Sequence, residues 1–157
     1  MKSLIDQHRE RHEDFMEILA NIRTFLISDH LTIKINAKAV YEMLLGLSRL
    51  VQFHLSGENH NIYNILITHQ NAMIRGMAWC FIDSEKPIRR VFESHYNKWL
   101  NNCTFNFTGD FITETLNMLD MLERHIQLEK YILLPKVEDA INLYGQPRSQ
   151  VSQIQGI

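Results

Sequence analysis

The stretches His54-Leu55-Ser56-Gly57-Glu58 and His125-Ile126-Gln127-Leu128-Glu129 decide both the predicted fold and the predicted site. Each is a histidine followed four residues later by a glutamate, and each leads into a bulky apolar run. Residues i and i+4 lie on one face of an α-helix, so each stretch offers an imidazole and a carboxylate in the same direction. Two such helices that face each other could hold one or two metal ions.

Both pairs lie in long segments with the apolar periodicity of bundle helices. Apolar residues recur at alternating spacings of three and four over about residues 3–27, 37–67, 71–101 and 109–142, which predicts four amphipathic helices. Long helices with short connections predict an all-α, antiparallel up-down-up-down four-helix bundle over residues 1–143, followed by a polar tail at 144–157. Pro87 predicts a kink or interruption of the third helix near Ser84. Residues 31–35 alternate weakly and are interpreted as loop.

The polar residues on the inward helix faces are predicted to meet in one layer. Two residues of antiparallel neighbours lie at one height when their sequence midpoint falls in the connection between them. The pairs formed by His54 with either His8 or His12, by His54 with Glu85, and by Glu85 with His125 meet this condition. His69 and His95 fit it less well. The layer is expected to contain His8, His12, His54, Glu58, Glu85, His125 and Glu129.

Such a layer in an apolar core needs an energetic reason. An unpaired buried carboxylate costs on the order of several kcal/mol or becomes protonated. A metal ion neutralises carboxylates and binds imidazoles in their neutral form. Ligation by imidazole and carboxylate without thiolate favours Fe, Mn or Zn, and carboxylates on opposed helices favour two ions about 3.5–4 Å apart.

Composition excludes several other classes of protein. The chain has 157 residues, of which 45% are hydrophobic and 22% charged, with a net charge of −2, so we expect one globular domain that binds neither nucleic acid nor a membrane. The two cysteines, Cys80 and Cys103, do not form a CxxC pair and are typical of reduced thiols. With no apolar leader or spanning segment, we expect a cytoplasmic protein.

These residues resemble the hemerythrin-like (HHE, cation-binding) family over about residues 3–140. The resemblance rests on three stretches: Gln7-His8-Arg9, the first His–Glu pair followed by Tyr63, and the second pair followed by Leu134-Pro135. It implies a non-haem di-iron site bridged by two glutamates, in proteins that carry or sense O₂, respond to NO or peroxide, or handle iron. By position, the ligands carried over are His54, Glu58, His125 and Glu129, with His12 or His8 from the first helix.

The sequence departs from that family on the third helix. The family usually has a histidine there, and the residue at the height of the layer is Glu85. This difference implies either an extra carboxylate ligand or a weakened second metal. A carboxylate-rich site would favour peroxide or O₂ chemistry over reversible binding of the diatomic ligand.

A second resemblance is to the Rsd/AlgQ anti-sigma regulators, which are four-helix proteins of this length. It lies in Ser56-Gly57 through Ile62-Tyr63 and in Leu128-Glu129-Lys130, and it implies partner binding without a metal. No nucleophile–base pair or phosphate-binding loop is evident, so turnover of an organic substrate is not expected. The prediction is a hemerythrin-like di-iron protein for O₂, NO or redox sensing or for iron handling, with Zn or Mn as possible metals and an unknown protein partner. The alternative is a metal-free four-helix interaction protein of the anti-sigma type.

Several residues also have ordinary structural interpretations. The two His–Glu pairs could be exposed helix-surface pairs, and His12 could be a hydrogen-bonded core histidine. Glu85 could be a partly exposed acid beside the proline. Tyr63 could hydrogen-bond the motif glutamates, but packing alone explains it equally well.

Overall fold

The computed structural model describes residues 1–27, 34–55, 59–102 and 104–144. Every regular element in these ranges is helical, which confirms the all-α prediction. The α-helices are α1 (Leu4–Ile27), α2 (Lys34–Phe53), α3 (Asn59–Ile67), α4 (Ala72–His95), α5 (Gly109–Leu128) and α6 (Leu134–Tyr144). Two π-helical turns, η3 (Tyr96–Leu100) and η4 (Glu129–Leu133), extend α4 and join α5 to α6.

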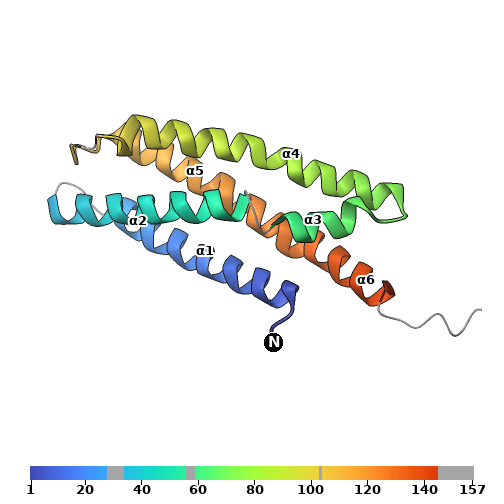
Figure 1. Ribbon diagram of the computed structural model, residues 1–157. Coiled ribbons are helices and arrows are strands. Elements are labelled where there is room, and N and C mark those ends of the chain that lie inside the picture. The colour runs from blue at the N-terminus through green and yellow to red at the C-terminus, as the bar shows by residue number, and fades with distance from the viewer. Residues whose placement is uncertain (28–33, 56–58, 103, 145–157) are drawn as a thin grey trace, which may run out of the picture.

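The helices pack side by side in an elongated assembly, as Figure 1 shows. Helix α1 packs against α2 and α5, α4 packs against α5 and α3, and α3 packs against α6. Helix α3 continues beyond the end of α2, and η4 and α6 continue beyond α5 (Figure 1). The arrangement is compatible with a helical bundle.

Named residues show how α4 begins and how the chain turns between η3 and α5. The side chain of Asn71 accepts a hydrogen bond of 2.9 Å from the backbone N–H of Met73, which caps the first turn of α4. In the connection to α5, Asn102 and Phe105 have φ angles of 58° and 59°, in the left-handed region. The ring of Phe105 packs edge-on against Tyr41 of α2 with 5.3 Å between ring centroids, which helps to hold this strained turn.

Four sequence predictions about element boundaries need correction or fall outside the described ranges. Of the kink or interruption expected at Pro87, the interruption is wrong, because α4 runs through the proline as one helix. A proline removes one backbone hydrogen bond, and the buried side chains of Glu85 and Ile88 on either side hold the helix against the core. The segment predicted as one helix over 37–67 is two helices, and α2 begins at Lys34 inside the stretch interpreted as loop. The predicted tail lies outside the described residues except for Tyr144, which ends α6.

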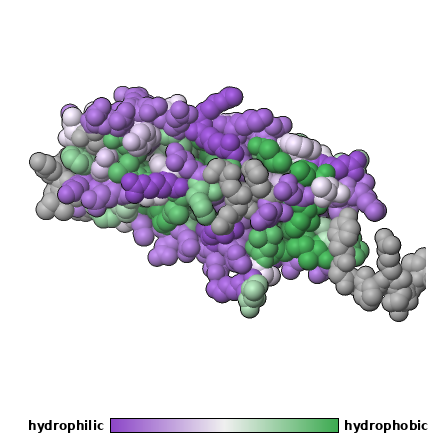
Figure 2. All heavy atoms as spheres, in the orientation of Figure 1, coloured by the Kyte–Doolittle hydropathy of each residue, from purple (hydrophilic) through white to green (hydrophobic). Residues whose placement is uncertain are grey.

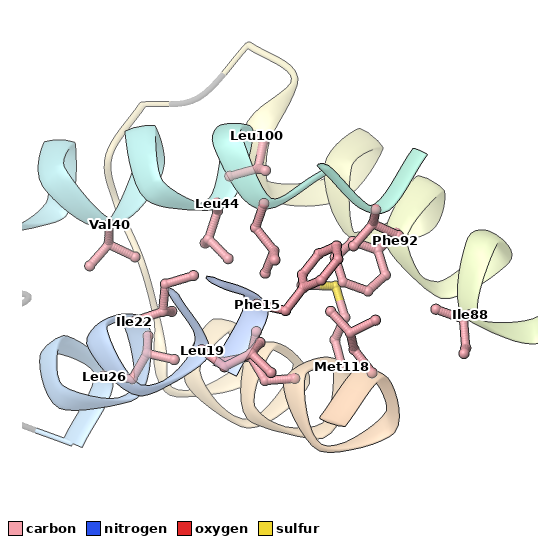
Figure 3. Close-up of a cluster of buried hydrophobic side chains, with 14 of the residues drawn as sticks. Phe15, Leu19, Ile22, Leu26, Val40, Leu44, Ile88, Phe92, Leu100 and Met118 are labelled. Atoms are coloured by element: carbon pink, nitrogen blue, oxygen red, sulfur yellow. The ribbon is translucent and has the colours of Figure 1, made fainter. Parts of the chain in front are cut away.

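Two hydrophobic clusters fill the interior. The first lies between α1, α2, α4 and α5 and includes Phe15, Leu44, Phe92 and Met118 (Figure 3). The second includes Ile5, Tyr63, Phe81, Leu133 and Val137, from the other end of the molecule. On α1, His8 and His12 lie between Ile5 of the second cluster and Phe15 of the first, and on α4 the buried Glu85 lies between residues of the two clusters. The predicted ligands therefore form a polar layer between two apolar cores.

The face shown in Figure 2 is mainly hydrophilic, and its most extended hydrophobic area lies near α6. Exposed apolar side chains there include Ile141 and Leu143. Among the described residues, no helix combines the length and the apolar character needed to cross a bilayer.

Candidate metal centre

Six of the seven predicted ligands lie in the described residues, and all six are buried: His8, His12, His54, Glu85, His125 and Glu129. The seventh, Glu58, lies outside the described residues. The six side chains come from α1, the π-helical turn after α2, α4, α5 and η4. They form two groups with the spacing of metal ligands, and the two groups share Glu129.

The first group is rich in imidazole. The Nε2 atoms of His12, His54 and His8 lie 2.8, 3.2 and 3.4 Å from Oε2 of Glu129. His8 and His12 are four residues apart on α1, so both rings point to the same side of that helix. Their ring centroids are 4.4 Å apart. Three imidazole nitrogens therefore converge on a single carboxylate oxygen.

The second group contains two carboxylates and one imidazole. Nε2 of His125 lies 3.2 Å from Oε1 of Glu129 and 3.9 Å from Oε1 of Glu85. Its other nitrogen, Nδ1, lies 3.3 Å from the hydroxyl of Ser84, which fixes the direction of the ring. The two oxygens of Glu129 are thus divided, with Oε2 facing the first group and Oε1 facing the second.

Tyr63 lies between the two carboxylates. Its hydroxyl oxygen is 2.8 Å from Oε1 of Glu85 and 2.9 Å from Oε1 of Glu129. Burial and the two nearby negative charges raise the pKa of Tyr63 far above its usual value, so the phenol keeps its proton. The hydrogen-bonding role that the sequence left open is therefore present, alongside the packing role that burial of the ring provides.

π-Helical turns occur at two of the ligand positions. Glu129 is the first residue of η4, and His54 lies in the π-helical turn that directly follows α2. A π-helical turn contains an extra residue per turn and so changes which side chains face inward beyond it. In η4 the facing side chains change directly after Glu129. At the end of this turn the buried Leu133 packs in the second apolar cluster.

Burial and the contacts within the site shift the pKa values of its ionisable side chains. Burial by itself would raise the pKa of Glu129, but polar contacts with His12, His125 and His54 hold it well below its usual value. Burial lowers the pKa of His8, so this imidazole favours its neutral form. Arg89 of α4 approaches from the surface and places Nη2 3.3 Å from Oε2 of Glu85. Glu129 is consequently ionised and Glu85 has a cationic neighbour.

The unsatisfied polar atoms of this site fit a metal. Nε2 of His125, which faces the carboxylates of the second group, is buried and has no hydrogen-bond partner within the described residues. A carboxylate oxygen has two lone pairs, so Oε2 of Glu129 cannot accept well-directed hydrogen bonds from three imidazoles at once. An ion in each group would use the Nε2 lone pairs as ligands. The residues present therefore fit a metal in both groups.

The other predicted histidine positions lie elsewhere. His95 is buried, and its Nε2 lies 2.7 Å from the hydroxyl of Thr115, away from both groups, as the midpoint condition indicated. His69 is partly exposed, and its Nδ1 accepts a hydrogen bond from the backbone N–H of Asn71. Two contacts of the site, Ser84 and Arg89, were not predicted from the sequence. Their helical positions, one residue before Glu85 and four after it, were the available signal.

No protein-family model, curated protein or solved structure matches this chain. Any function assigned to the chain therefore rests on the geometry of the polar layer.

Proposed function

We propose that this chain is a hemerythrin-like protein that binds two non-haem iron ions in the polar layer. In this proposal the first group (His8, His12, His54 and Glu129) holds one ion and the second group (Glu85, His125 and Glu129) holds the other. The protein uses the pair to sense O₂ or NO, or to handle iron, and passes any signal to another protein.

The observation that carries the proposal is the position of Glu129. Its two oxygens face different ligand groups, and the whole side chain is buried. Bridging carboxylates of this kind, together with inward histidines at helical spacing, are how four-helix proteins hold pairs of metal ions. A lone salt bridge between Glu129 and one histidine would not need the four other buried ligand side chains, because each added buried polar group costs free energy.

The donor types support iron over softer metals. The described groups offer imidazole nitrogen and carboxylate oxygen and no thiolate, and Cys80 is exposed on α4 outside both groups. This set suits Fe, Mn and Zn. Two carboxylates among the described donors partly balance the charge of two divalent or trivalent ions.

When bound, a pair of iron ions would supply reversible electron transfer to a small ligand. The protein side chains do the rest. Tyr63 holds a proton at its hydroxyl oxygen, within reach of both Glu85 and Glu129. Ser84 orients the His125 ring, and Arg89 supports Glu85 from the surface side. The apolar clusters on both sides exclude water from the layer.

The proposal includes a four-helix antiparallel topology. It treats α2 with α3 as one interrupted rod, and α5, η4 and α6 as another. The packing of α1 on α2, of α3 on α4, and of α4 and α1 on α5 supports this interpretation.

Metal analysis of the purified full-length chain tests the proposal. After expression with iron, elemental analysis should give about two irons per chain, as in other two-metal sites that share a bridging ligand. Supplying Mn or Zn in competition identifies the preferred ion. A folded, colourless protein without metal would instead favour a metal-free interaction protein of the anti-sigma type.

A further inference from the structure

A separate cavity opens between α2 and α4 on the surface side of Arg89. It has a volume of about 580 Å³, within the range of small-molecule sites. Its lining includes Leu45, Val51 and Phe92, together with the charged residues Arg49, Arg89 and Glu93. None of these residues belongs to the two ligand groups.

The floor of the cavity is apolar. Val51 and Phe92 are buried members of the first hydrophobic cluster, and Leu45 packs against that cluster. Such a floor suits the hydrocarbon part of a ligand, because covering it removes apolar surface from water on both sides.

Two guanidinium groups supply the polar part. Arg49 is exposed and has no ion pair or hydrogen bond within the described ranges. Arg89 uses Nη2 for the carbonyl oxygen of Leu55 and for Glu85. Its Nη1 and Nε make no further bond to the described part of the chain. The fork of N–H groups on a guanidinium matches the two oxygens of a carboxylate.

We propose that this cavity binds a small organic carboxylate, with its charged group between Arg49 and Arg89 and its hydrocarbon part over Val51 and Phe92. Glu93 also lines the cavity, and its negative charge disfavours multiply charged anions such as phosphate. The favoured ligand is therefore a monocarboxylate with a short apolar body.

The cavity is connected to the metal centre through Arg89. The same guanidinium contacts Glu85 through Nη2, so a carboxylate bound to its other N–H groups would share its positive charge with Glu85. The link between the cavity and a metal centre rests on the proposed function. The binding of a carboxylate in the cavity does not depend on that function.

Calorimetric titration of sodium hexanoate into the full-length protein tests the proposal. Saturable binding of one hexanoate per chain is expected, with hexylamine and inorganic phosphate binding far more weakly. Arg49→Gln should weaken hexanoate binding about tenfold, because it removes a charge-assisted hydrogen bond. Arg90→Gln is the matched control, because Arg90 is exposed on α4 and does not line the cavity. Arg49→Lys keeps the charge without the fork and should give an intermediate affinity.

Three results would overturn the proposal: no saturation with hexanoate, equal affinities for the Arg49→Gln and Arg90→Gln proteins, or hexylamine binding as tightly as hexanoate. Circular dichroism checks that all three variants keep their helical content. Metal analysis of the same samples separates this proposal from that of the metal centre. A metal-free chain with hexanoate binding that depends on Arg49 would remove the metal proposal and leave this one standing.

Discussion

The hydroxyl oxygen of Tyr63 lies 2.9 Å from Oε1 of Glu129 in a part of the core where both side chains are buried. The same oxygen is 2.8 Å from Glu85, and a phenol has one proton, so only one carboxylate accepts it at any moment. This hydrogen bond neutralises neither carboxylate, and Glu85 has Arg89 beside it while Glu129 has histidines around it. In the proposed metal centre, a bound cation balances the negative charge that remains.

Replacing Tyr63 by phenylalanine should weaken metal binding about tenfold, the lower end of the effect expected when a hydrogen bond to a ligand is lost. The ring still fills its place in the second hydrophobic cluster, so the fold should persist. Competition with a coloured chelator measures the affinity. Tyr131→Phe is the matched control because Tyr131 is 69% exposed. Equal affinities for the two variants would mean that the Tyr63 hydroxyl does not support the ligands.

Glu129→Gln should remove most of the bound metal from both groups. The amide keeps the size of the side chain but loses the negative charge. Its oxygen can still bind one metal ion, but its nitrogen cannot bind the other. Elemental analysis of the purified variant measures the loss. Glu42→Gln, at an exposed position of α2, should keep the metal content of the unaltered protein. Two ions per chain in the Glu129→Gln protein would contradict the shared role of this carboxylate.

His125→Ala should lower the metal content to about one ion per chain, because it removes the only imidazole of the second group and leaves the three imidazoles of the first. His95→Ala should keep both ions, since this buried histidine contacts Thr115 instead of a ligand group. Elemental analysis of the two variants in parallel makes the comparison. If His95→Ala loses an ion while His125→Ala does not, the assignment of the second group is wrong.

The His95 side chain should make folding stability depend on pH. Burial lowers the pKa of His95 from 6.5 to about 4 in the folded chain. Between these values the unfolded chain binds a proton that the folded chain does not, so the free energy of unfolding falls as the pH falls. The full contribution is about 3 kcal/mol, lost between pH 6.5 and about 4.

Urea unfolding at pH 7 and pH 5 measures this effect. The unaltered protein should lose about 2 kcal/mol more than the His95→Leu protein over this interval. Histidines of the metal centre are present in both proteins, so their contributions cancel in the comparison. A loss of the same size in both proteins would show that His95 is not the titrating group.

Helical periodicity accounts for most of what could be predicted. It placed His54, Glu85, His125 and Glu129 on inward faces, and equal distance from the connections brought them to one height. The midpoint condition works because antiparallel helices with short connections convert sequence distance directly into height, at about 1.5 Å per residue. The midpoint condition applied equally to His8 and His12, so the sequence could not show which of them is the ligand. In the structure both lie against Glu129.

The errors have local physical causes. Periodicity does not register π-helical turns, because one extra residue per turn changes the facing side chains without a distinctive residue type. The division of the second predicted helix and the turn η4 were therefore not foreseen. The effect of Pro87 was overestimated because tertiary packing on α4 outweighs one missing backbone hydrogen bond. Contacts of Ser84 and Arg89 depend on side-chain directions across helices, which a single sequence does not fix.

The polar layer between the two hydrophobic clusters has a consequence for how the molecule unfolds. Each cluster is a continuous apolar interior, and the layer between them is held by charged and polar contacts. Without an ion, those contacts leave buried atoms unsatisfied, and the two ends can open as separate cooperative units. With ions bound, ligands from α1, α4, α5 and η4 are tied to one another, so amide hydrogen exchange at both ends should slow together. The metal would thus make two small cores unfold as one domain.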